Sequence, residues 1–202
     1  MDTELIGPGR VFTNWFGRDF RDGKVFSSNS HGSLEEHYGV AYNLGSGRAR
    51  WGDGWINVDL EADADIRADV RDLSMIASDS ADAVAAIHVL EHFYFWEAKD
   101  LILEWRRILK PGGKMIIEVP CLDKIVDYIG QCLAANENIM EFMTLHALYG
   151  DPKHKNPLMA HKFGWFRAHL QQFLGECGMR EITIKTAHYH FPQRDCRFEC
   201  IK

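Results

Sequence analysis

The sequence of 202 residues lacks several features that would mark its location or class. It has no apolar run long enough to span a membrane, and its N-terminus, MDTELIGPGR, has no apolar signal-peptide core. Its five cysteines are odd in number and form no CxxC pair, which is typical of reduced thiols in a reducing compartment. It has no internal repeat and no low-complexity run. These absences predict a soluble, cytoplasmic protein.

Basic residues are also scarce, with 23 Lys and Arg against 29 Asp and Glu and a net charge of -6. Nucleic-acid-binding proteins usually carry a basic stripe, so the charge balance argues against a nucleic acid as partner, although a local basic patch is not excluded. A hydrophobic fraction of 46% supports a globular protein, and the length fits one domain, or one domain with an appendage.

The clearest pattern lies in residues 40–60, VAYNLGSGRARWGDGWINVDL. A short apolar run breaks at Gly45-Ser46-Gly47, and a second run ends with the acid Asp59. A strand, a glycine turn, a crossover and a second strand that ends in a carboxylate are typical of the first half of a nucleotide-binding βαβ unit. The third glycine of G-x-G-x-x-G is missing, and the short crossover has room only for a very short helix or an irregular turn.

Further strands and two helices are predicted from apolar runs, β-favouring residues and helical periodicity. The strands are expected at 66–68, 83–87, 114–120, 182–184 and 197–201, and the helices at 100–109 and 165–177, with Gly178 as a C-terminal cap. This order predicts an α/β fold, a doubly wound, mostly parallel Rossmann-like sheet with a C-terminal antiparallel hairpin. Ligands bind such sheets beyond the carboxyl ends of the strands, where Gly45, Gly47, Asp59, Asp69 and His88 are expected.

Five motifs follow one another in a specific order: NLGSG, NVDL, ADVRDL, HVLEHF and LKPGGKMIIEVP. In this order and spacing they resemble the class I S-adenosylmethionine-dependent methyltransferases, strongly over residues 40–120 and more loosely at KFGWF, LGECGM and ITI. The second strand, GWINVD, resembles that of small predicted methyltransferases often found among sugar-modifying genes. The resemblance implies S-adenosyl-L-methionine as cofactor and S-adenosyl-L-homocysteine as product.

The resemblance also implies roles for individual residues. Gly45, Ser46 and Gly47 would lie beside the methionine part of the cofactor, and Asp59 with the adjoining Leu60 would hold the ribose. Asp69 and the Val70 backbone N–H would face the adenine. His88 would line the pocket near the methyl group. Asn43 departs from the pattern, because the family often has an acid at the end of the first strand.

Methyl transfer needs little beyond alignment, because the electrophile is already activated, but a hydroxyl acceptor benefits from a general base. The candidates are His88, His92, His146, His161 and Asp151, each with a purely structural role as the alternative. His88 and His161 are the predicted catalytic residues. The segment HVLEH also matches the H-x-x-E-H metallopeptidase motif, which needs both histidines on one helical face. Since His88 is expected to end a strand, no metal is expected.

Two segments flank or interrupt the predicted domain. Residues 1–37, rich in aromatics, are expected to form an arm that packs on the domain 38–202, on a second subunit as a homodimer, or over the ligand site. The alternative is a simple surface extension. Residues 139–164 are predicted to be a substrate lid. The function predicted is methyl transfer to a small-molecule acceptor, for example a hydroxyl of a sugar or glycan precursor. The alternatives are a macromolecule methyltransferase and a non-catalytic binding or scaffold protein that retains the fold.

Overall fold

The computed structural model describes residues 18–21, 24–27, 38–47, 51–52, 54–60 and 63–202. The chain divides into two units, Met1–Gly32 and Ser33–Lys202. In the first unit, β1 (Arg18–Arg21) and β2 (Lys24–Ser27) form an antiparallel hairpin. The rest of the predicted arm, 1–37, lies outside the described residues, so its packing stays a prediction. Among the described residues, no helix is long and apolar enough to cross a membrane.

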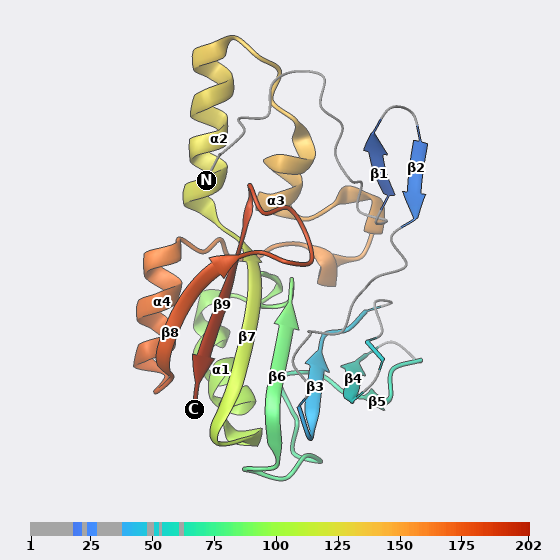
Figure 1. Cartoon of the computed structure of the whole chain (residues 1–202), viewed down its shortest axis with the longest axis vertical. Coiled ribbons are helices and arrows are strands. Elements are labelled where there is room, and N and C mark those ends of the chain that lie inside the picture. The colour runs from blue at the N-terminus through green and yellow to red at the C-terminus, as the bar shows by residue number, and fades with distance from the viewer. Residues whose placement is uncertain (1–17, 22–23, 28–37, 48–50, 53, 61–62) are drawn as a thin grey trace. The chain divides into compact units, whose positions relative to one another are not determined.

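The second unit contains a seven-stranded sheet with the strand order β5-β4-β3-β6-β7-β9-β8 (Figure 1). Its strands are β3 (Ala41–Leu44), β4 (Trp55–Asp59), β5 (Ile66–Arg67), β6 (Ala81–Ile87), β7 (Leu109–Pro120), β8 (Arg180–Thr186) and β9 (Asp195–Ile201). Strands β3 to β7 are parallel, whereas β9 runs antiparallel between β7 and β8. The predicted mostly parallel sheet with a C-terminal antiparallel hairpin is confirmed.

The strand order reverses direction between β3 and β6. From β3 the chain adds β4 and β5 on one side, and then returns to place β6 on the other side of β3. In open α/β sheets, ligands bind beyond the carboxyl ends of the strands at this kind of switch point. The residues that directly follow β3 and β6 are therefore the first place to look for a site.

The helical segments are η1 (Leu90–His92), α1 (Phe95–Ile108), α2 (Leu122–Ala135), η2 (Glu141–Met143), α3 (Leu145–Tyr149), η3 (Pro152–His154), η4 (Pro157–Met159) and α4 (Arg167–Glu176). The helices predicted at 100–109 and 165–177 correspond to α1 and α4. Helix α1 begins earlier than predicted because the Glu97 carboxylate accepts a hydrogen bond from the Tyr94 backbone N–H (2.9 Å) and caps the first turn. Gly178, with φ +81°, follows the end of α4 as predicted.

The larger hydrophobic core includes the buried face of α1 and side chains of α4. The apolar face of α1 includes Leu101, Trp105 and Ile108, spaced four and three residues apart, and all three are buried. Each fully buried Leu or Ile contributes about 1.5–3 kcal/mol. The Trp105 indole N–H also donates to the Val70 carbonyl oxygen (3.0 Å), which ties the loop after β5 to α1.

A second, smaller core contains Ala41, Trp51, Trp55, Ala83, Ala85 and Ile116. The described residues between β3 and β4 contain no helix, in line with the short crossover. Trp51 lies in that crossover and stacks on Tyr189 with ring centroids 4.8 Å apart. Asn57 of β4 holds Trp51 in place, because its amide accepts from the Trp51 N–H (2.9 Å) and donates to the Trp51 carbonyl (2.9 Å).

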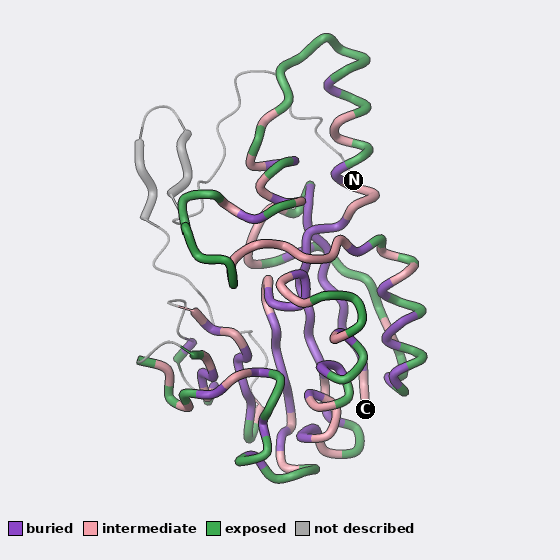
Figure 2. The backbone as a smooth tube through the Cα atoms, turned by 180° about the vertical axis from the view of Figure 1, so that it is seen from behind, coloured by how far each residue is buried: buried purple, intermediate pink, exposed green. Residues whose placement is uncertain are grey.

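A long insertion joins β7 to α4 and carries α2, η2, α3, η3 and η4. Figure 1 shows it beyond the carboxyl ends of β6 and β7, and Figure 2 shows that α2 is largely exposed while the strands are buried. The end of the insertion is fixed to η1, since the backbone N–H groups of Lys162 and Phe163 donate to the Glu91 carbonyl (2.8 and 3.3 Å). The predicted lid, 139–164, thus meets the segment that follows β6.

Candidate active site at the carboxyl edge of the sheet

The glycine turn after β3 adopts a conformation that L side chains rarely take. Gly45 has φ +63° and Gly47 has φ +54°. A Cβ on Gly45 would lie 2.6 Å from Cγ2 of Val89, so only glycine fits there. A Cβ on Gly47 would meet no atom of the described residues within 4 Å. The turn is therefore packed against the segment after β6 on one side and open at Gly47.

Two polar side chains complete this turn. Oδ2 of Asp59, at the end of β4, accepts a hydrogen bond from the Gly47 N–H (2.8 Å). The Ser46 side-chain oxygen is buried and has no hydrogen-bond partner among the residues that the structure describes. A buried hydroxyl without a partner is costly, and it suits a place where a ligand supplies the missing hydrogen bond. The turn and the acid are adjacent, as predicted, while their contact with a ligand stays a prediction.

The remaining predicted cofactor residues lie near the ends of β4 and β5. The Asp59 carbonyl accepts from the Ala68 N–H (3.0 Å), which brings 68–70 beside β4. Leu60 is half exposed and Val70 is buried. The Asp69 carboxylate is paired with Arg71 through Nε–Oδ1 (3.0 Å) and Nη2–Oδ2 (2.7 Å). The hydrogen bond from Arg71 lowers the pKa of Asp69. An adenine contact by Asp69 would compete with Arg71 and stays a prediction.

His88 follows β6 and lies between two buried carboxylates. Its φ of +55° is unusual for a non-glycine residue, and its side chain is 7% exposed. Nδ1 lies 3.0 Å from Oε1 of Glu91 in η1, and Nε2 lies 3.2 Å from Oδ2 of Asp195 in β9. The end of β6, η1 and β9 are thereby joined through one imidazole ring.

The charges in this trio stabilise one another. Burial disfavours a charged imidazole, but Asp195 and Glu91 outweigh burial and raise the pKa of His88 to about 9. Burial likewise opposes ionisation of Glu91, yet His88 lowers the pKa of Glu91 to about 2. His88 is thus protonated at neutral pH, with both ring nitrogens directed at carboxylates and no lone pair to accept a proton. Of the two predicted catalytic histidines, His161 is the better candidate for a base.

Asp195 and His190 belong to this cluster but were not among the predicted site residues. The His190 ring centroid lies 3.9 Å from that of His88, and burial is the main reason that the pKa of His190 is well below its ordinary value. Arg194 pairs with Asp195 through Nε–Oδ1 (2.5 Å) and Nη2–Oδ2 (2.9 Å). No local sequence signal identifies Asp195, because its position depends on β9 pairing with β7.

A second pair of histidines, His92 and His161, lies beside Glu91. Their ring centroids are 4.9 Å apart, with the planes at 80°. Nδ1 of His92 lies 3.3 Å from the Ala160 carbonyl oxygen, and Nδ1 of His161 lies 2.7 Å from that of Ala147. Because a carbonyl oxygen only accepts, Nδ1 is the donor in both rings, which leaves Nε2 as the possible acceptor or ligand atom. The structure thus brings the predicted lid residue His161 to the carboxyl edge.

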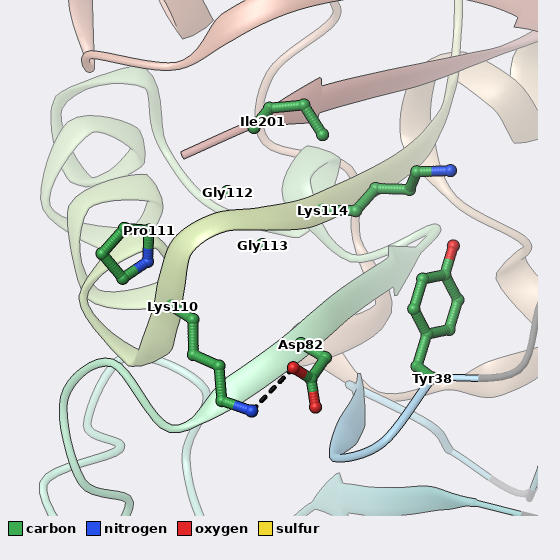
Figure 3. Close-up of a pocket in the computed structure, with 8 residues that line it drawn as sticks. All are labelled: Tyr38, Asp82, Lys110, Pro111, Gly112, Gly113, Lys114 and Ile201. Carbon is green, nitrogen blue, oxygen red and sulfur yellow. Dashed lines mark hydrogen bonds and ion pairs between the residues drawn. The ribbon is translucent and has the colours of Figure 1, made fainter.

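A hollow of about 310 Å³ lies at the opposite edge of the sheet (Figure 3). It is lined by Tyr38, Asp82, Lys110, Pro111, Gly112, Gly113, Lys114 and Ile201. An ion pair between Lys110 Nζ and Asp82 Oδ1 (2.6 Å) crosses it. Most of these residues lie at the amino ends of β6 and β7, and Ile201 ends the antiparallel strand β9. Because none of them is a predicted site residue, the hollow is separate from the glycine turn and the histidine clusters.

Residues 55–117 match the protein-family model described as "Methyltransferase domain". A comparison with curated protein sequences gives no match. Among solved structures, the chain is similar to an S-adenosylmethionine-dependent methyltransferase from Archaeoglobus fulgidus, with 15% identity, a TM-score of 0.55, and 81% of this chain and 86% of that chain covered.

Two further solved structures are similar. A methyltransferase from Thermotoga maritima, described as a possible histamine N-methyltransferase, has 13% identity and a TM-score of 0.54, with 84% of each chain covered. The 1,6-didemethyltoxoflavin-N1-methyltransferase from Burkholderia thailandensis, solved with 1,6-didemethyltoxoflavin and S-adenosylhomocysteine, has 13% identity and a TM-score of 0.56, with 81% of this chain and 70% of that chain covered. At these identities the structures show the shared fold, and with the domain match over residues 55–117 they confirm the resemblance to class I methyltransferases, whereas the finer resemblance of the GWINVD strand stays a prediction.

Proposed function

We propose that this chain, which carries a methyltransferase domain on the fold of the class I S-adenosylmethionine-dependent methyltransferases, transfers a methyl group to a hydroxyl of a small-molecule acceptor. The cofactor is S-adenosyl-L-methionine. The observation that carries the proposal is the contact between Gly45 and Val89, which places the glycine turn directly against the segment bearing His88, Glu91 and His92. A cofactor at the turn therefore lies next to the histidine clusters.

The residues around the turn fit the cofactor. Among the residues that the structure describes, Gly47 leaves room for close approach of a ligand, and the Ser46 hydroxyl has no hydrogen-bond partner. Asp59 orders the turn through Gly47 and accepts from the ribose hydroxyls. When bound, the cofactor supplies a methyl group on a positively charged sulfur, which is already activated for in-line displacement. The protein's own task is alignment and exclusion of water.

His161 is the residue proposed to accept the proton of the acceptor hydroxyl. Its Nδ1–H is held by the Ala147 carbonyl, so Nε2 carries the lone pair that a general base needs. The buried His88, charged and paired with Glu91 and Asp195, holds η1 in position beside it. His88 is thus a positioning residue that also lines the pocket.

The lid, residues 139–164, is proposed to select the acceptor. It contributes Met143, which is buried, and Met140 and Met159, which are partly buried. Methionine side chains form an adaptable apolar wall, while His161 offers a polar contact to a hydroxyl. A sugar or glycan precursor is the proposed acceptor class. The small acceptor bound in the Burkholderia thailandensis structure supports an acceptor of small size.

The first test is calorimetric titration of the full chain with S-adenosylhomocysteine. Replacing Asp59 with Ala removes charge-assisted hydrogen bonds worth about 1.5–3 kcal/mol, so affinity is expected to fall about tenfold to a hundredfold. Asp63→Ala, an exposed acid nearby, is the matched control. Absence of binding in the wild type would favour a non-catalytic scaffold, and equal affinity in both variants would remove Asp59 from the site.

The second test is an acceptor screen read out as a cofactor-dependent mass gain of one methyl group. With the acceptor found, His161→Ala should lower the turnover number and leave S-adenosylhomocysteine affinity nearly unchanged. Methylation of proteins or nucleic acids alone would favour a macromolecule methyltransferase. Poor cofactor binding with normal turnover at saturation would place His161 in the cofactor site and contradict the lid assignment.

A further inference from the structure

We propose that Glu91, His92 and His161 form a binding site for a divalent transition-metal ion, with Zn²⁺ the best match. One candidate ligand atom from each residue lies within 4.8 Å of the others. The site goes beyond the proposed function: it shares His161 with that function, but it includes no residue of the glycine turn, so metal binding is measured without the cofactor.

The backbone holds the three residues together. Glu91 and His92 belong to η1, shortly after β6, whereas His161 lies near the end of the insertion. The N–H groups of Lys162 and Phe163, the two residues after His161, donate to the Glu91 carbonyl (2.8 and 3.3 Å). The proximity of the three side chains thus follows from backbone hydrogen bonds and not only from side-chain rotamers.

The histidine tautomers suit metal ligation. Each Nδ1–H is directed at a backbone carbonyl, that of Ala160 for His92 and that of Ala147 for His161. Metal-binding histidines nearly always donate their other ring N–H to a carboxylate, a carbonyl or water, which fixes the ring and makes the free nitrogen more basic.

Glu91 provides independent support. Its side chain is 2% exposed, and Oε1 faces Nδ1 of His88 at 3.0 Å. Oε2 has no hydrogen-bond partner among the described residues, although a buried, ionised carboxylate oxygen is costly to leave without one. An ion between Glu91 and the two histidines would satisfy this oxygen while His88 retains the other.

The ligand set identifies the class of ion. Two histidines and one glutamate with an open fourth position are a zinc set, whereas Mg²⁺ and Ca²⁺ prefer oxygen ligands alone. Tetrahedral Zn²⁺ with bonds of about 2.0–2.2 Å separates its ligands by about 3.4 Å, so ligand atoms that lie within 4.8 Å of one another need to close by up to about 1.4 Å. This site differs from the H-x-x-E-H motif considered from the sequence, since His88 is paired with two carboxylates and is not a ligand.

Metal binding also has a consequence for His161. The Nε2 lone pair that ligates the ion is the one that would accept a proton, so a bound Zn²⁺ and proton acceptance by His161 exclude each other. Metal binding by His161 is therefore measured in the absence of turnover, so that it is tested separately from proton acceptance.

The test uses the tag-free full chain, stripped with a chelator and titrated with Zn²⁺ against a chromophoric competitor. We expect one Zn²⁺ per chain and an affinity that falls at least about tenfold in His92→Ala and in His161→Ala, since even loss of an outer-shell partner costs about 10–100-fold. His154→Ala, an exposed histidine of the same insertion, should bind as the wild type does.

Two further measurements distinguish this site from binding by cysteine and from loss of folding. Co²⁺ substitution should give a visible spectrum without a thiolate-to-cobalt band, because the five cysteines are not ligands. Far-ultraviolet circular dichroism shows whether each variant is folded, and S-adenosylhomocysteine titration of the same samples shows whether the proposed function holds. Absence of wild-type Zn²⁺ binding, a thiolate band, or wild-type Zn²⁺ affinity in both ligand variants would overturn the metal site while leaving the cofactor result to stand on its own.

Discussion

The stability of the protein should depend on pH through His88. This imidazole lies between Glu91 and Asp195, and its pKa is raised from 6.5 to about 9 in the folded protein. Between these two pH values the native state binds more protons than the unfolded state, so the free energy of unfolding falls as pH rises. The contribution of His88 is fully present below about pH 6.5 and is lost as pH passes through about 9.

The size of the effect follows from the same two values. A difference of about 2.5 pKa units at 1.36 kcal/mol per unit gives about 3 kcal/mol. The pairing that raises the pKa of His88 also lowers the pKa of Glu91 and of Asp195, so this energy is counted once. It is a large fraction of the roughly 5–15 kcal/mol that stabilises a typical domain.

The assay is urea unfolding followed by tryptophan fluorescence from pH 6 to 9.5, for the wild type, His88→Gln and the exposed control His154→Gln. His88→Gln leaves the buried Glu91 without its cation and Asp195 with Arg194 alone, and should lower stability by about 3–5 kcal/mol near pH 7. Burial raises the pKa of the Cys177 and Cys200 thiols, which adds a decline above about pH 8.5. This decline is common to all three proteins, so the difference between curves isolates His88.

An NMR titration of His88 in the wild type makes the test independent of whether His88→Gln folds. A measured pKa at or below 6.5 would refute the prediction, because the carboxylates would then not outweigh burial. Parallel stability curves for the wild type and His88→Gln between pH 6.5 and 9 would refute it as well.

Three other predictions concern local contacts. Gly45→Ala places a Cβ against Val89 on a residue with positive φ, so we expect a loss of about 1–3 kcal/mol in unfolding free energy and weaker S-adenosylhomocysteine binding. If neither the unfolding free energy nor the affinity changes, the packing of the turn is contradicted. Trp105→Phe deletes the indole hydrogen bond to Val70 and should cost about 1–3 kcal/mol in urea unfolding, whereas an unchanged midpoint would show that this bond does not hold the loop. The pKa of the Asp195 carboxyl lies below its ordinary value because the attraction of His88 outweighs burial, so the free energy of unfolding should decline as pH falls below about 4. A free energy of unfolding that stays constant in urea titrations below pH 4 would exclude the pairing of Asp195 with His88.

Much of the site's scaffold was predictable because its signals are local. The apolar run, Gly45 and Gly47, and the acid Asp59 predicted a strand, a turn and a second strand, and the structure has all three in that order. The apolar spacing of Leu101, Trp105 and Ile108 predicted helix α1. Each of these features needs only neighbouring residues and the periodicity of a strand or helix.

The assignment of Asp69 shows where local reasoning is incomplete. The resemblance implied that Asp69 contacts the adenine, but the Asp69 carboxylate is paired with Arg71, two residues away. The type and position of an acid predict that it lies at the sheet edge, whereas its partner depends on side-chain geometry that the sequence pattern does not contain.

The sequence by itself determined the mostly parallel sheet and the residues at its carboxyl edge, because strand patterns, glycine turns and end-of-strand acids are encoded within short stretches, whereas the strand order with its switch point came from the structure. Only the tertiary structure decided that Asp195 meets His88 and that His161 meets Glu91 and His92. The first contact depends on β9 inserting antiparallel beside β7, with Asp195 in register with Pro120. The second depends on backbone hydrogen bonds between η1 and the end of the insertion. Both join segments far apart in the chain, and such pairings are set by packing and register rather than by any local pattern.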